Sequence, residues 1–163
     1  MPPSQQPEIR RAAPEDAPAI ANLLHESFAA FRPLYTEGGF SATTLTAQQV
    51  LERMREGPIW VALRDGQVLG TVAIVVKGKS AHIRGMAVLP SERGTGIGAK
   101  LLRRVENWAI DAECVRLFLS TTPFLSEAIR LYERFGFRPT DEGPNDLLGT
   151  PLFTMKKTIS PRD

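Results

Sequence analysis

The chain has 163 residues, of which 42% are hydrophobic and 23% are charged, and its formal net charge is +2. These values are ordinary for one globular domain with a sizeable core, and so small a net charge argues against a nucleic-acid-binding surface. One cysteine, Cys114, excludes an internal disulfide and a cysteine-rich zinc site, and two histidines argue against a zinc enzyme. The longest apolar run, Val72 to Val76, is too short to span a membrane. We expect a single cytoplasmic domain over residues 1–163, monomeric or homodimeric, with residues 1–7 disordered and with neither nucleic-acid nor membrane partners.

The amino-terminal third predicts a short strand and two helices. The strand is expected over Glu8 to Ala12, and Pro14 with two acids after it begins the first helix. Thr46 and Gln49 form a capping box that begins the second helix. Arg32 to Thr44 has the composition of a loop but carries three large apolar side chains, so we expect a loop that covers part of the molecule.

The middle of the chain predicts an antiparallel meander. Ile59 to Arg64 and Gln67 to Lys77 alternate as strands around an Asp-Gly turn, which favours a hairpin of type I′ or a related type. Gly78-Lys79 makes a second turn into a central strand that Pro90 ends. Gly85 within that strand is suited to a β-bulge, which would break the alternation of side chains between the two faces.

Two crossovers complete the predicted fold. An amphipathic helix is expected from about Gly96 to Asp111, and Val115 to Ser120 then returns as a strand parallel to the central one. A second helix follows Pro123 and ends at Gly136, and the last strand is expected over Leu152 to Lys157. Strands first and helical crossovers later predict an α/β fold with a mixed sheet.

Three glycines, at positions 94, 96 and 98, lie between the central strand and the helix. Free N–H groups and the dipole at a helix amino terminus favour a phosphate there, and glycine lets the backbone approach it. The pattern Gly94-x-Gly96-x-x-Ala99 also satisfies a dinucleotide fingerprint. However, four residues separate the strand from the first glycine, and the next strand ends without the acid that would hold a ribose. A Walker A loop fails because no Gly-Lys-Ser/Thr follows.

The glycine loop resembles the acyl-CoA loop of the GNAT superfamily, Gln/Arg-x-x-Gly-x-Gly/Ala, which Arg93, Gly96 and Gly98 satisfy. Ala128 to Phe137 is similar to a second GNAT signature, Ala-x-x-Leu-Tyr-x-x-x-Gly-Phe, although Leu125 stands where the family often has Asn. The resemblance implies a mostly antiparallel central sheet splayed between its fourth and fifth strands and flanked by helices. It implies an N-acetyltransferase that takes acetyl-CoA as cosubstrate, needs no metal, and transfers the acetyl group by direct attack of a primary amine in a ternary complex.

The resemblance also assigns cofactor-binding residues. Main-chain N–H groups near Ala87 and Val88 are the implied donors to the oxyanion. Arg93 flanks the expected pyrophosphate, although charged residues before helices are commonly only solvated. The implied set follows the central strand and the loop after it: Met86, Ala87, Val88, Arg93, Gly94, Thr95, Gly96, Ile97, Gly98 and Ala99.

Two residues are candidates for catalysis. Tyr132 can protonate the leaving sulfur, although its place on an apolar helix face also suits a core tyrosine. His82 lies four residues before Met86, where many GNAT enzymes carry a catalytic glutamate, and in a regular ladder it would share a face with Arg84, Met86 and Val88. A partly exposed strand histidine is the equal alternative.

The sequence offers fewer candidates for binding the acceptor amine than for binding the cofactor. Tyr35 and Glu37 are candidates for contact with a small-molecule amine or a peptide amino terminus, and their alternative roles are loop packing and a solvated charge. A non-catalytic acyl-CoA-binding or sensing module would keep the glycine loop but would need neither Tyr132 nor a base.

Overall fold

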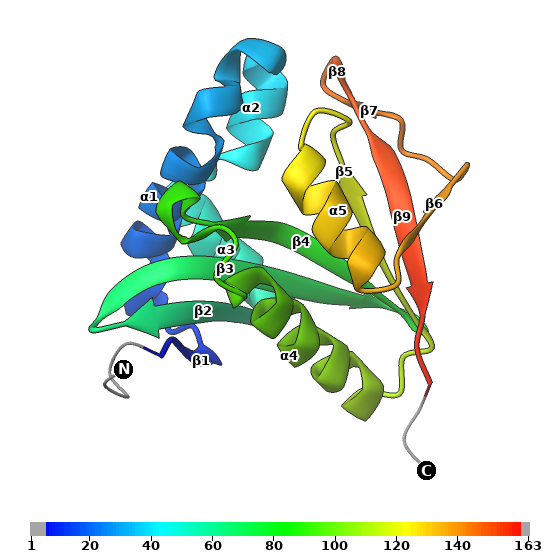
Figure 1. Ribbon diagram of the computed structural model, residues 1–163, viewed down its shortest axis with the longest axis horizontal. Helices are drawn as coiled ribbons and strands as arrows, with labels where there is room; N and C mark the ends of the chain where they lie inside the picture. The colour runs from blue at the N-terminus through cyan, green and yellow to red at the C-terminus, as the bar shows by residue number, and fades with distance from the viewer. Residues whose placement is uncertain (1–5, 161–163) are drawn as a thin grey trace.

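A computed structural model describes residues 6–160 of the chain (Figure 1). The expected disorder over residues 1–7 lies mostly outside this range, and the first strand begins at Glu8. Within the described residues the strands form a seven-stranded sheet in the order β1-β2-β3-β4-β5-β9-β6 and a separate β7-β8 hairpin. The strands are β1 (Glu8–Arg11), β2 (Ile59–Arg64), β3 (Gln67–Lys77), β4 (Ser80–Val88), β5 (Arg116–Thr121), β6 (Arg138–Thr140), β7 (Asp146–Leu147), β8 (Thr150–Pro151) and β9 (Phe153–Thr158).

Helices cover both faces of the sheet, with α1, α2 and α3 on one side and α4 and α5 on the other (Figure 1). Each face has its own apolar core. Leu101, Leu102 and Phe137 are fully buried on the α4 side, while Leu24 and Val50 are buried beneath α1 and α3. The helices are α1 (Ala17–Phe28), α2 (Glu37–Thr43), α3 (Ala47–Glu56), α4 (Ile97–Asp111) and α5 (Ser126–Arg134), with short 3-10 turns at Pro14–Asp16, Ala29–Leu34 and Pro90–Glu92.

The predicted meander and crossovers are confirmed. Asp65 and Gly66 both have positive φ, +52° and +79°, as a type I′ turn requires. β4 and β5 pair in parallel across the α4 crossover, and Gly136 follows α5 with a φ of +104°. The resulting sheet is mixed and mostly antiparallel.

The expectation of a loop over Arg32 to Thr44 was wrong, because this segment contains a 3-10 turn and α2. Thr36 caps α2 by accepting a hydrogen bond from the Gly39 N–H at 3.0 Å. The side chain of Thr36 also donates to the Leu148 carbonyl at 2.8 Å, and its N–H donates to Thr150 Oγ1 at 2.9 Å. These contacts tie α2 to the β7-β8 hairpin, so tertiary structure stabilises a glycine-rich helix of low propensity.

The parallel pairing between β4 and β5 is short. It spans Ser80 to His82 on β4, and His82 pairs with Phe118 as the last partner. β4 continues to Val88 and β5 to Thr121, so the two strands separate beyond that point (Figure 1). From residue 83 onward the β5-facing backbone groups of β4 therefore have no ladder partner in β5.

A bulge at Gly85 re-aims the second half of β4. On β3, Ala73 pairs with Arg84 and Thr71 pairs with Ala87, so two residues of β4 face one residue of β3. Gly85 has a φ of +63°, which glycine adopts without strain. The bulge expected at Gly85 is therefore present, and the alternation that a regular ladder would have is broken. Ile83, Met86 and Val88 all contact the α4-side core, so Met86 and Val88 do not share a face with His82 and Arg84.

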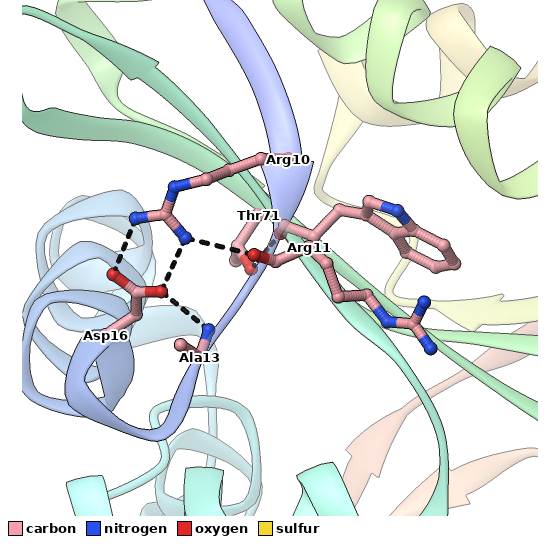
Figure 2. Close-up of polar contacts among 6 residues, drawn as sticks. Arg10, Arg11, Ala13, Asp16 and Thr71 are labelled. Atoms are coloured by element: carbon pink, nitrogen blue, oxygen red, sulfur yellow. Dashed lines mark hydrogen bonds and ion pairs between the residues drawn. The ribbon is translucent and has the colours of Figure 1, made fainter.

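An ion pair fixes the chain where β1 leads into α1 (Figure 2). Arg10 donates from both terminal nitrogens to the Asp16 carboxylate at 2.8 and 3.0 Å, and the Ala13 N–H donates to the same carboxylate at 2.7 Å. The hydrogen bond from Arg10, the largest cause, lowers the pKa of Asp16. This arrangement orients α1 against the sheet.

Asp16→Asn should therefore destabilise the fold by about 1 kcal/mol at neutral pH, since Arg10 is partly exposed and the loss is one charged hydrogen-bonding group. Because the folded pKa of Asp16 is lowered, its contribution is present above pH 3.8 and is lost as pH falls through the folded pKa. Urea unfolding at several pH values measures this difference. Arg10→Gln should cost a similar amount, and additive effects in the double variant would contradict the pairing.

Candidate active site

The glycine loop forms an open turn before α4. Gly96 is the residue before the helix and has a φ of +91°, and Gly94 has a φ of +83°. A Cβ placed at either glycine would meet no atom within 4 Å, so the space in front of the loop is open. Thr95 Oγ1 donates to the Glu92 carbonyl at 2.5 Å, and Glu92 pairs with Arg64 at 3.0 Å. The free N–H groups of the first turn of α4 thus face open space from a braced loop.

Arg93 bridges this loop to α1. Its Nη2 donates to the Ser27 carbonyl at 2.8 Å, and its guanidinium carbon lies 5.9 Å from the centre of the Phe31 ring. Ser27 Oγ in turn donates to the Val88 carbonyl at 3.3 Å. The cation is therefore held beside the loop by contacts from the opposite face of the sheet.

Gly98 allows α5 to approach α4. A Cβ at this position would lie 2.6 Å from Leu131 Cδ2 and 3.4 Å from Met86 Cε. Any larger residue would push α5 away or displace Met86. The third glycine of the loop thus serves close packing rather than a left-handed turn.

An open cleft of about 1190 Å³ follows the split between β4 and β5. Gly94, Gly96 and Gly98 line it on the α4 side, and Tyr35 and His82 line it on the α1–α3 side. The separated strands thereby give access to one cleft from both faces of the sheet.

His82 lies at the point where the split begins. Its ring stacks on Phe118 with the ring centres 4.5 Å apart and the planes 8° apart. Nδ1 is buried and has no hydrogen-bond partner among residues 6–160. Burial first, and then the positive charges of Arg84, Lys77 and Arg53, lower the pKa of His82 to about 4. The imidazole is neutral at pH 7, and it is a weaker base than its ordinary pKa of 6.5 suggests.

The lowered pKa predicts a pH-dependent stability. Between pH 6.5 and about 4, unfolded His82 binds a proton that the folded residue does not, so stability falls as pH falls through this range. His82→Phe keeps an aromatic ring against Phe118 and removes the titration. Its free energy of unfolding should therefore change less with pH in this range than that of the wild type, as urea titrations at several pH values would measure. Parallel wild-type and variant curves would contradict the assignment.

Two tyrosines line the cleft. Tyr132, on α5, is only 7% exposed and its ring contacts Phe137 edge to face at 6.0 Å. Burial raises the pKa of Tyr132 to about 12, with a smaller contribution from Tyr35. Tyr35 is buried between the rings of Phe40 and Phe124, and burial also raises the pKa of Tyr35. Both phenols are protonated near neutral pH.

Most of the residues predicted for the site line this one cleft. Thr95 and Glu37 do not: Thr95 braces the loop, and Glu37 is exposed in the first turn of α2. The lining includes Met86, Ala87, Val88, Arg93, Gly94, Gly96, Ile97, Gly98, Ala99, Tyr132, His82 and Tyr35.

Sequence reasoning missed several polar residues of the cleft, of which Arg53 and Thr122 are two. Arg53 lines it from α3, and Thr122 lines it directly after β5, with a buried hydroxyl close enough to Tyr35 to oppose the rise of its pKa. Arg53 lies three residues after the buried Val50, so its position on the inner face of α3 was a signal for it.

The sequence profile of the Acetyltransferase (GNAT) family matches residues 19–137. The chain belongs to the GNAT family of acetyltransferases. It is 31% identical over 143 residues to the uncharacterized N-acetyltransferase YjgM of Escherichia coli K12, a match that covers 84% of this chain and 85% of the relative. An IAA acetyltransferase of Azospirillum brasilense is 38% identical over 86 residues, which are 52% of this chain and 55% of that protein.

Solved structures share the GNAT fold. The PaiA N-acetyltransferase of Thermoplasma acidophilum, crystallised with coenzyme A, aligns with a TM-score of 0.81 at 18% identity and covers 94% of this chain and 99% of its own. The ribosomal-protein-S18-alanine N-acetyltransferase of Escherichia coli aligns with a TM-score of 0.76 at 17% identity, over 97% of both chains.

The family and the relatives make this chain an acetyl-CoA-dependent acyltransferase. Its residues fit that cosubstrate, because the open space before Gly94 and Gly96 meets free N–H groups and Arg93. Over residues 6–160, no three His, Cys, Asp or Glu side chains are grouped so as to hold a metal ion. None of the helices in the same range combines the length and apolarity that crossing a membrane requires.

Proposed function

We propose that this GNAT protein transfers the acetyl group of acetyl-CoA to a primary amine by direct attack in a ternary complex. The observation that carries the proposal is the cleft through the β4–β5 split, which connects the α4 amino terminus to the side of the sheet lined by Tyr35 and His82. Two substrates entering from opposite faces would meet in this split. Direct transfer needs such a meeting point and no covalent enzyme intermediate.

The phosphate end of acetyl-CoA is assigned to the loop before α4. Main-chain N–H groups of Gly94 and of residues 96–99 would donate to the pyrophosphate, and Arg93 would add a positive charge beside it. The pantetheine arm would then lie along the unpaired edge of β4 after residue 83. This direction brings the thioester to Met86, Ala87 and Val88.

The chemistry uses few groups of the chain. Main-chain N–H groups near Ala87 and Val88 would stabilise the negative charge on the thioester oxygen while the amine nitrogen bonds to the carbonyl carbon. Tyr132 would donate its hydroxyl proton to the sulfur as the carbon–sulfur bond breaks. The products are then an amide and a free thiol.

The proton lost by the amine is assigned to His82 or to water beside it. With a pKa of about 4, His82 is neutral at pH 7 and is able to accept a hydrogen bond from the amine, but it does not retain the proton. We therefore assign His82 the role of passing the proton to solvent, and we expect the attacking amine to arrive already neutral.

Small-molecule amines and peptide amino termini both fit an open cleft. Named relatives and fold neighbours act on both classes: one relative is a thialysine N-epsilon-acetyltransferase of Bos taurus, and the S18-alanine enzyme acts on a ribosomal protein. Thialysine is a small molecule and S18 is a protein, so these names do not choose between the classes.

Thiol release from acetyl-CoA across a panel of amines and peptides tests the proposal. We expect release only when an acceptor is present, and thermal stabilisation by acetyl-CoA and CoA but not by NAD. Stabilisation by acetyl-CoA without turnover of any acceptor would instead favour a non-catalytic acyl-CoA-binding or sensing module. Stabilisation by NAD alone would contradict both.

A further inference from the structure

Arg53 is a partly buried cation on the inner face of α3. It projects into the cleft, and its Nη1 lies 2.8 Å from the point that a Cβ on Gly85 would occupy. Among residues 6–160, Arg53 forms no ion pair within 4 Å. A guanidinium withdrawn from water without a partner is costly, so its retention in a cleft indicates an anionic ligand.

Other cations surround it. Arg84 and Lys77 line the same end of the cleft. Glu56 contacts Arg84 at 3.4 Å and is half exposed. Burial, and then the charge of Arg84, lower the pKa of Arg53 to about 10 against the weaker opposing charge of Glu56, so Arg53 remains charged at pH 7. This end of the cleft therefore carries an excess of positive charge.

The phosphates of acetyl-CoA do not account for this charge. Arg53 comes from α3, whose apolar residues pack on the face of the sheet opposite α4. The proposed phosphate loop, Arg93 to Gly98, leads into α4 on the other face. The remaining anion that could neutralise the positive charge around Arg53 is one carried by the acceptor.

The position of Arg53 relative to the reacting centre indicates which anionic group of the acceptor it binds. Arg53 lies at the Gly85 bulge, directly before the Met86 to Val88 segment where the thioester is assigned. An anion bound at Arg53 is therefore only a few bonds from an amine that attacks there. A carboxylate is the group that a guanidinium pairs with in a two-point geometry.

We propose that the acceptor is a small amine that carries a carboxylate close to its amino group, as a free α-amino acid does, and that Arg53, assisted by Arg84, binds this carboxylate. The inference rests on the proposed acetyl transfer. A peptide amino terminus, which has no carboxylate beside its amine, is the competing class.

Pairs of acceptors that differ only in the carboxylate test this proposal, with transfer measured in the full-length protein at saturating acetyl-CoA. The pairs are phenylalanine with phenethylamine, tyrosine with tyramine, and lysine with cadaverine, together with the corresponding amino-acid amides and short peptides. We expect kcat/KM for the accepted amino acids to exceed that for the decarboxylated amines by about 10- to 100-fold, the value of one charged hydrogen-bonded pair. Arg53→Gln should remove most of this ratio, through the KM for the amino acid.

Arg55→Gln is the matched control, because Arg55 is exposed on the same helix and outside the cleft. It should keep the wild-type ratio.

If Arg53→Gln does not fold, Arg84→Gln should still reduce the ratio, and 3-phenylpropanoate should inhibit the wild type competitively against phenylalanine. Equal use of paired acceptors, a preference for peptides, or an equal loss on both members of a pair in Arg53→Gln would overturn the inference alone. Absence of transfer to every acceptor would overturn the proposed function with it.

Discussion

Tyr132→Phe should lower kcat by about 10² or more while acetyl-CoA affinity and melting temperature stay close to those of the wild type. The substitution keeps the ring, which packs on Phe137 in the core, and removes only the hydroxyl of this cleft-lining residue. If Tyr132 is only a core residue, the loss is at most one hydrogen bond, about 0.5 to 1.5 kcal/mol of stability, with turnover almost intact. Stopped-flow thiol release and thermal melting together separate the two roles.

The raised pKa of Tyr132 shapes this prediction. At about 12 it lies above the ordinary phenol value of 10, so burial keeps the proton on the oxygen throughout the neutral and mildly alkaline range. It also makes the phenol a weaker acid than a thiol, whose pKa is about 8.5, whereas a phenol of ordinary pKa, about 10, would be closer to the thiol in acidity. Proton donation then depends on the negative charge that develops on sulfur. We accordingly expect no loss of activity from Tyr132 ionisation below about pH 11.

Tyr35→Phe provides the comparison, since Tyr35 is the chain's other tyrosine and lines the same cleft. It should act mainly on the KM of the acceptor. Wild-type kcat in Tyr132→Phe, under conditions where chemistry limits the rate, would remove Tyr132 from the mechanism and leave the hydroxyl a packing role.

Short sequence patterns predicted the turns and the bulge, because their geometry depends on one or two residues. The Asp65-Gly66 turn needs positive φ at both positions, and those residue types favour it. The bulge at Gly85 was expected for the same reason, because a glycine in a strand marks a left-handed or crowded position. A bulge there was also expected to break the alternation of side chains along the strand, and it does. Met86 points to the α4 side, and His82 does not, because one extra residue reverses the alternation.

Tertiary contacts decided what the sequence did not show. Gly38 and Gly39 lower helix propensity, yet α2 forms because they pack closely on Leu148 and Thr150 of the β7–β8 hairpin. No local pattern encodes that partner, more than a hundred residues away in the chain.

The candidate site also has a part that local sequence encodes and a part that tertiary contacts assemble. The residues assigned to the cofactor lie in one continuous stretch, residues 86–99, which holds a glycine signature, so the sequence alone was enough to propose them. The acceptor side is assembled from α2, α3 and β5, and Arg53 was missed because its role depends on a Gly85 that approaches from another element.

Gly96→Val should abolish the thermal stabilisation by CoA. In the wild type, CoA at about 100 times its dissociation constant stabilises the fold by about 2.7 kcal/mol. Gly96 has a φ of +91° and open space where a Cβ would stand, so valine strains the turn and projects into the place assigned to the pyrophosphate. It would also re-aim the N–H groups that begin α4.

Gly96→Val strains the backbone as well as altering the proposed CoA site, and Gly78→Val is the control for the strain. Gly78, in the β3–β4 turn, also has a positive φ, +63°, and also has no atom within 4 Å of the point that a Cβ would occupy, but it does not line the cleft. Each substitution should cost about 1 to 3 kcal/mol through the left-handed conformation, so the unliganded proteins should melt at similarly lowered temperatures. The response to CoA should then differ, being retained in Gly78→Val and absent in Gly96→Val. CoA stabilisation of Gly96→Val equal to that of Gly78→Val would remove the loop from the binding site, because the strain is matched and only the position relative to the cleft differs.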